Sequence, residues 1–113
     1  MKDDRVYLMH IRDAINRVQE YTRDGKDVFL SDIKTQDAVL RNLEIIGEAT
    51  KNLSAELRAA NTDIPWKQIA GLRDTLIHRY FGVRLDLVWE VVEQHIPVLQ
   101  ARILALLAGP SSP

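Results

Sequence analysis

The residues with the clearest capacity for chemistry fall in one short segment of the 113-residue chain. They are Arg73, Asp74, His78, Arg79 and Tyr80. An arginine pairs with phosphate oxygens and stabilises charge that develops in a transition state. A histidine transfers protons near neutral pH. Because the 2′-hydroxyl of RNA is itself a nucleophile, arginine and histidine are a sufficient minimal set for RNA transesterification. The segment therefore suits phosphate-ester chemistry.

The spacing within this segment leaves a second interpretation open. On a helix, Asp74 and His78 are direct neighbours, so the carboxylate can hold the imidazole in one tautomer. Arg73 and His78 lie about 140° apart around an ideal helix. Both reach one cleft only if the arginine bends over, the helix distorts or a second subunit completes the cleft. On spacing alone, a solvated network of ion pairs is the alternative to catalysis.

Composition and charge exclude several other kinds of site. The absence of cysteine excludes a disulfide scaffold, a thiolate zinc site, an iron–sulfur cluster and a cysteine nucleophile. The net charge of −1 disfavours a protein that coats nucleic acid through many phosphate contacts. A focused basic site remains compatible with that charge.

The carboxylates Glu44 and Glu48 lie one helical turn apart and raise the question of a metal site. A di-iron bundle needs Glu-x-x-His motifs from two helices, and the sequence offers none. We therefore expect no metal, and an exposed or ion-paired face with Arg41 and Arg79 as partners. Arg41 as an additional RNA contact is the other interpretation.

Four further side chains are expected to have structural roles. We expect His10 at the surface, and His95 as a packed or capping side chain near Pro97. Trp66 and Trp89 are expected to anchor the core or a dimer interface.

The elements that position these residues are predicted to be helices only. Apolar residues recur at three- and four-residue spacing, which predicts an all-α fold: an antiparallel bundle of four main helices plus short helical pieces. The first helix is expected over about 4–23, with Gly25 as its left-handed cap. Ser31 or Thr35 is expected to cap the second. Phe29 and Leu30 are expected in the connection, plugging the core.

The second half of the chain is more interrupted. A short piece is expected over 54–60, and Pro65 is suited to start a helix at Trp66. The last helix is expected over about 85–107, with a kink at Pro97. We expect a single domain over residues 1–109 and a flexible tail over 110–113. No signal peptide or membrane-spanning run is recognised, so a cytoplasmic protein with no membrane association is expected.

Residues 72–82 resemble the signature of the HepT-like family, within the HEPN superfamily. Its pattern is Arg, four residues, His, any residue, Tyr, which Arg73, His78 and Tyr80 fit position by position. Asp74 departs from it, because many relatives carry asparagine, and this alters the charge at the site more than its geometry. The likeness extends to residues 35–39, 41–49, 64–66 and 88–90.

The resemblance implies a homodimeric helical bundle in which two signature segments meet at a cleft. It implies a metal-independent ribonuclease without a cofactor, acting on RNA as the toxin of a toxin–antitoxin pair. Arg73 would bind the scissile phosphate and His78 would be the acid/base residue, supported by Asp74 and Arg79. An MntA-type nucleotidyltransferase antitoxin would silence the toxin by attaching AMP to Tyr80. The alternative is a non-catalytic nucleotide-binding or adaptor bundle that acts through this partner.

Overall fold

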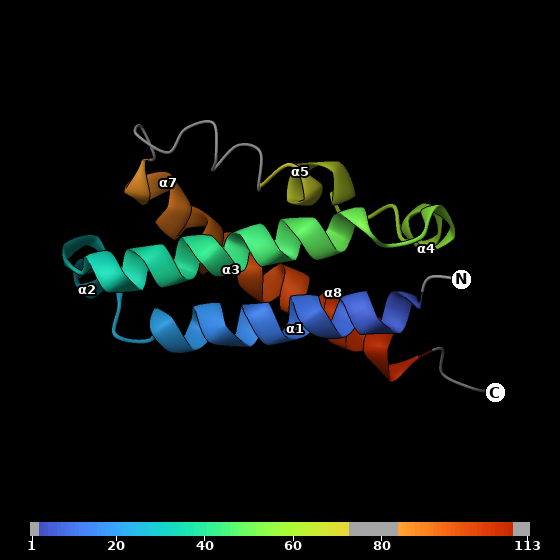
Figure 1. Cartoon of the computed structure of the whole chain (residues 1–113), viewed down its shortest axis with the longest axis horizontal. Coiled ribbons are helices and arrows are strands. Elements are labelled where there is room, and N and C mark those ends of the chain that lie inside the picture. The colour runs from blue at the N-terminus through green and yellow to red at the C-terminus, as the bar shows by residue number, and fades with distance from the viewer. Residues whose placement is uncertain (1–2, 73–83, 110–113) are drawn as a thin grey trace.

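The computed structural model describes residues 3–72 and 84–109, and this part of the chain is helical without strands (Figure 1). The all-α prediction is confirmed. The elements are α1 (Asp4–Tyr21), α2 (Lys26–Ser31), α3 (Ile33–Lys51), α4 (Ala55–Ala60), α5 (Trp66–Ala70), α7 (Leu85–Glu90), the π-helical turn η2 (Val91–His95) and α8 (Ile96–Ala108).

The long helices α1 and α3 form an antiparallel pair, and α8 packs on α1 behind them (Figure 1). The short helix α5 lies against α3, and α7 lies against α2. These elements account for three of the four predicted main helices. The fourth, expected to carry residues 73–80, falls outside the described residues.

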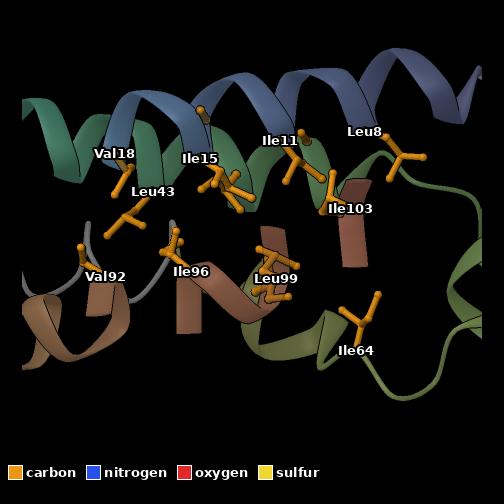
Figure 2. Packing of buried hydrophobic residues seen from close by; sticks show 14 of the residues in the cluster. Leu8, Ile11, Ile15, Val18, Leu43, Ile64, Val92, Ile96, Leu99 and Ile103 are labelled. Carbon is orange, nitrogen blue, oxygen red and sulfur yellow. The ribbon is translucent and has the colours of Figure 1, made fainter. Parts of the chain in front are cut away.

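The core lies between α1, α3 and α8. Apolar side chains of α1 at three- and four-residue spacing point toward α8 in Figure 2, as the periodicity predicts. Full burial of an aliphatic side chain stabilises the fold by about 1.5–3 kcal/mol. The buried residues of the three helices include Leu8, Ile11, Ile15 and Val18 of α1, Val39, Leu43 and Ile46 of α3, and Ile96, Leu99 and Ile103 of α8.

The connection between α1 and α3 contains the extra helix α2. Phe29 is fully buried, so the prediction that it plugs the core is confirmed, whereas Leu30 is 40% exposed. Gly25 has the predicted positive φ, at 98°, but with ψ at 178°. Almost only glycine adopts this extended mirror region. Gly25 therefore begins α2, and α1 ends earlier, at a C-cap formed by Thr22.

The N-cap of α3 is Asp32, so the prediction of Ser31 or Thr35 is wrong. The Asp32 carboxylate accepts hydrogen bonds from the backbone N–H of Lys34 at 3.1 Å and from the Thr35 hydroxyl at 2.7 Å. Ser31 cannot serve, because it is the last residue of α2. A carboxylate is also the better partner for the positive end of the helix.

The last helical run changes its winding just before Pro97. The kink expected there takes the form of the turn η2, after which Ile96 and Pro97 open α8. Pro97 has no N–H for the carbonyl of Glu93, and its ring crowds that carbonyl. A wider π turn accommodates both effects.

The run Leu85–Ala108 also meets the length and composition of a membrane span, with a mean hydropathy of 1.2. One such helix is weak evidence for a membrane span, so the expectation of no membrane-spanning run stays a prediction. A core helix of a soluble bundle passes the same test, and Val88, Val92 and Ile103 of this run are buried in the core. The cytoplasmic location and the single domain over 1–109 stay predictions.

Candidate functional site

The five residues of the signature fall outside the described part of the chain. They are Arg73, Asp74, His78, Arg79 and Tyr80, and the roles assigned to them stay predictions. What the structure describes is how the chain is held on either side of them. Leu72, the first residue of the signature, is the last described residue before Arg73, and Arg84 is the first described residue after the signature.

Before the signature, α5 is anchored to α3. Trp66 and Ile69 are buried, with exposed fractions of 7% and 9%. The indole Nε1 of Trp66 donates a hydrogen bond to the backbone oxygen of Asn61 at 2.9 Å. Pro65 precedes the helix, as predicted. The chain therefore enters the signature from a fixed helix.

After the signature, α7 is anchored to α2. The rings of Trp89 and Phe29 lie 5.5 Å apart between their centroids, and Val88 is buried. The Arg84 guanidinium donates a hydrogen bond to the Asp86 carboxylate at 2.8 Å, which lowers the pKa of that carboxyl. The prediction that Trp66 and Trp89 anchor the core is confirmed.

The Arg41 side chain lines a cleft of about 340 Å³ between α1 and α3, called here the α1–α3 cleft. Because α1 and α3 are antiparallel, the first turns of α1 face the second half of α3. The cleft is lined by Tyr7, His10, Arg41, Glu44, Ile45, Glu48, Ala49 and Asn52.

Within this cleft Arg41 is only loosely paired. Its Nη1 lies 3.7 Å from Oε2 of Glu44, and the two side chains are 72% and 28% exposed. Such a long, exposed ion pair contributes little to stability. The predicted pairing of Arg41 with Glu44 is confirmed, and the RNA contact of Arg41 stays a prediction. In the described residues, no three His, Asp or Glu side chains gather as metal ligands.

The aromatic residues of the cleft are Tyr7 and His10, whose rings meet edge to face with centroids 6.0 Å apart. His10 is exposed, as predicted. The sequence analysis did not predict that His10, Tyr7 and Asn52 line this cleft. Helical periodicity could have placed Asn52 on the face of Arg41 and Glu44. No local sequence pattern could have predicted that Tyr7 of α1 lies against that face of α3.

A second concavity of about 570 Å³ lies between α5 and α8 and is called here the α5–α8 groove. Its polar edge carries Arg102, whose Nε lies 2.8 Å from Oδ2 of Asp63. His95 is exposed at this edge and makes no capping hydrogen bond, so its predicted packed or capping role is wrong. The apolar lining is formed by Ile64, Pro65, Ile69, Leu72, Val91, Ile96, Val98 and Leu99.

Comparison with known proteins shows that the chain is similar to one family. The sequence profile described as Ribonuclease HepT-like matches residues 11–106. That match includes α3, both anchoring helices and the whole signature.

Individual relatives agree with that match. A protein of Thermococcus cleftensis named "Probable ribonuclease HepT" is 45% identical over 85% of this chain and 88% of its own length. A protein of Caldanaerobacter subterraneus named "Putative RNase" is 42% identical over 95% of this chain and 96% of its own.

A third relative is a longer protein. The Methanocaldococcus jannaschii protein named "Gamma-glutamylcyclotransferase and putative RNase" is 50% identical over 94% of this chain, which spans 48% of that relative. No solved structure matches the chain.

Proposed function

Because the chain belongs to the Ribonuclease HepT-like family, we propose that it is a metal-independent endoribonuclease of the HEPN type. The observation that carries the proposal is the family match over residues 11–106, which spans Arg73, His78 and Tyr80. Two relatives that cover most of this chain carry ribonuclease names. The described helices α5 and α7 hold the chain on both sides of these residues.

In the proposed reaction, His78 removes the proton from an RNA 2′-hydroxyl. The 2′-oxygen attacks the adjacent phosphorus, and the bond from phosphorus to the 5′-oxygen breaks. The departing 5′-oxygen takes up the proton that His78 removed, so the products are a 2′,3′-cyclic phosphate and a 5′-hydroxyl and His78 returns to its neutral form. Arg73 stabilises the additional negative charge on the phosphate in the transition state. Asp74 and Arg79 support this pair electrostatically.

The proposal includes a homodimer in which two signature segments share a cleft. The α5–α8 groove supports this arrangement, because its apolar lining reaches Leu72, the residue before Arg73. Val98, also in the groove, is 65% exposed. Burying such apolar surface against a second copy would favour association.

The proposal also includes control by an MntA-type nucleotidyltransferase antitoxin in the cytoplasm. Transfer of AMP from ATP to the Tyr80 hydroxyl, with release of pyrophosphate, would place bulk and negative charge beside the RNA site. The added charge would repel the RNA phosphates, as with other charge-adding modifications. The chain would then be the toxin of the pair.

Cleavage is tested with purified protein and single-stranded RNA in the presence of EDTA. We expect cyclic-phosphate products from the parent protein and at least a hundredfold slower cleavage by Arg73→Ala and His78→Ala, in line with loss of a charge stabiliser or an acid/base group. Arg23→Ala, which removes an exposed arginine in the turn after α1, is the matched control. Equal cleavage by all variants would reject the assignment. Inactivity of the parent, combined with stoichiometric partner binding, would favour the adaptor alternative.

The switch is tested separately by incubating the protein with the nucleotidyltransferase partner and ATP. We expect the mass of one AMP on Tyr80 and loss of cleavage. Tyr80→Phe should stay unmodified, whereas Tyr21→Phe, at an exposed tyrosine of α1, should be modified as the parent is. AMP on another residue, or on none, would contradict the switch.

A further inference from the structure

The α1–α3 cleft offers an aromatic and apolar surface of the kind on which nucleobases stack. The half-buried ring of Tyr7 is flanked edge-on by the imidazole of His10, with an interplanar angle of 87°. Ile45 and Ala49 of α3 line the same cleft. Proteins that bind single-stranded RNA stack unpaired bases on such aromatic faces. A cleft of about 340 Å³ falls in the size range of small-ligand sites.

Glu44 restricts which base this cleft can accept. Glu44 lines a cleft that also contains Glu48, and its ion-pair partner Arg41 lies 3.7 Å away and is largely exposed. A carboxylate only accepts hydrogen bonds, so an RNA base must supply donors to it. Guanine carries two neighbouring donors, N1–H and N2–H₂, that match the two oxygens of one carboxylate. Adenine, cytosine and uracil lack this pair on their Watson–Crick edges.

Arg41 supplies the complementary charge for the phosphate of the same nucleotide. The side chain is 72% exposed on the same face of α3 as Glu44, one turn away. A guanidinium binds phosphate oxygens through its fork of N–H donors. Tyr7, Glu44 and Arg41 thus suit contacts with the face of the base, the edge of the base and the phosphate, respectively.

We propose that the α1–α3 cleft binds one guanine nucleotide of single-stranded RNA, outside the scissile phosphate. Tyr7 stacks on the base, Glu44 accepts hydrogen bonds from its N1–H and N2–H₂, and Arg41 contacts the phosphate. This inference rests on the proposed function for the identity of RNA as the ligand. It adds a sequence preference that the signature residues do not explain.

The test measures binding without cleavage, in a His78→Ala background. The probes are a 5′-labelled short oligoadenylate and the same oligonucleotide with one central guanine, followed by fluorescence anisotropy. We expect the guanine probe to bind at least about fivefold more tightly, as one bidentate base contact provides. Glu44→Gln has only one acceptor oxygen and should abolish this preference, measured as the ratio of the affinities for the two probes. Glu20→Gln, at an exposed position of α1, should retain it.

Equal binding of the two probes, or a guanine preference that persists in Glu44→Gln, would overturn the proposal. Tyr7→Leu provides a second criterion, because it should weaken binding of both probes, and circular dichroism at the assay temperature checks that this variant is folded. The two proposals fail separately. If the parent protein cleaves no RNA but the His78→Ala variant prefers the guanine probe, only the proposed ribonuclease activity is rejected. If cleavage depends on Arg73 and His78 but the two probes bind equally, only the proposed guanine site in the α1–α3 cleft is rejected.

Discussion

The carboxylate of Asp4 accepts two hydrogen bonds from Ser54, a residue 50 positions away in the chain. One comes from the backbone N–H at 2.8 Å and the other from the hydroxyl at 2.6 Å. The same hydroxyl oxygen accepts a hydrogen bond from the N–H of Leu57 at 3.1 Å and so caps α4. The first turn of α1 is therefore tied to the connection between α3 and α4, at the end of the pair where Tyr7 and Asn52 line the cleft.

Ser54→Ala should lower the free energy of unfolding by about 1–2 kcal/mol, because it removes both the helix cap and the hydroxyl hydrogen bond to Asp4 and keeps only the backbone N–H bond. Urea denaturation measures the change. The control is Ser31→Ala, whose hydroxyl only donates to the Val28 carbonyl at an exposed position. It should cost less than about 0.5 kcal/mol. Equal losses for the two variants would contradict a tertiary role for Ser54.

The amides of Gln19 and Gln100 exchange hydrogen bonds of 3.0 and 2.9 Å and join α1 to α8. Gln19→Ala and Gln100→Ala should each lower the free energy of unfolding by about 1 kcal/mol. The double variant should lose less than the sum by at least about 0.5 kcal/mol, because the second change removes a partner already lost. Gln19→Ala combined with Gln94→Ala, an exposed residue of η2, should be additive. Additivity of both pairs would rule out the coupling.

The hydroxyl of Thr35 donates to the Asp32 carboxylate and holds the pKa of that carboxyl below its ordinary value of 3.8. The N–H groups of Lys34 and Thr35 act in the same direction. Thr35→Val should raise the pKa of Asp32 toward 3.8, as followed by NMR titration of its carboxyl carbon. Thr62→Val, in an exposed turn, should leave it unchanged. An unmoved pKa in Thr35→Val would contradict this cause.

The direction of that shift also determines a pH dependence of stability. A lowered pKa in the folded state means that the unfolded chain binds the proton more readily. The Asp32 contribution is therefore present above the ordinary pKa and is lost as pH falls through the folded value. Denaturation at neutral pH and at pH 2 should show the stability gap between the parent and Thr35→Val shrinking in acid. If the difference in stability between the parent and Thr35→Val is the same at both pH values, the link between Asp32 ionisation and stability is contradicted.

Arg41→Gln should weaken binding of both RNA probes and reduce the slope of log affinity against log salt by about 1, as expected for one phosphate contact. The measurement uses the His78→Ala background over a series of salt concentrations. Arg23→Gln, which removes an exposed arginine from the turn after α1, is the control for net charge. If both variants show the same slope, Arg41 does not contact the phosphate.

The sequence alone predicted most helices because their causes are local. The spacing of Leu8, Ile11, Ile15 and Val18 defines a buried face of α1 whatever helix packs on it. Pro65 likewise predicts the start of α5 without tertiary information. The cap of α3 was mispredicted because Asp32 and Ser31 are neighbours, and α2 decides which of them is available.

The candidate site likewise has one part that the sequence could predict and another that only the tertiary structure brought together. The signature and the pairing of Arg41 with Glu44 could be read from short spacings along the chain. Only the antiparallel packing of α1 on α3 brought Tyr7 and His10 to that face of α3 and created the cleft. A helical period shows which residues share a face, but which faces meet depends on burial of the core as a whole. The sequence therefore determined the chemistry available to this protein, and the tertiary structure decided which groups act together.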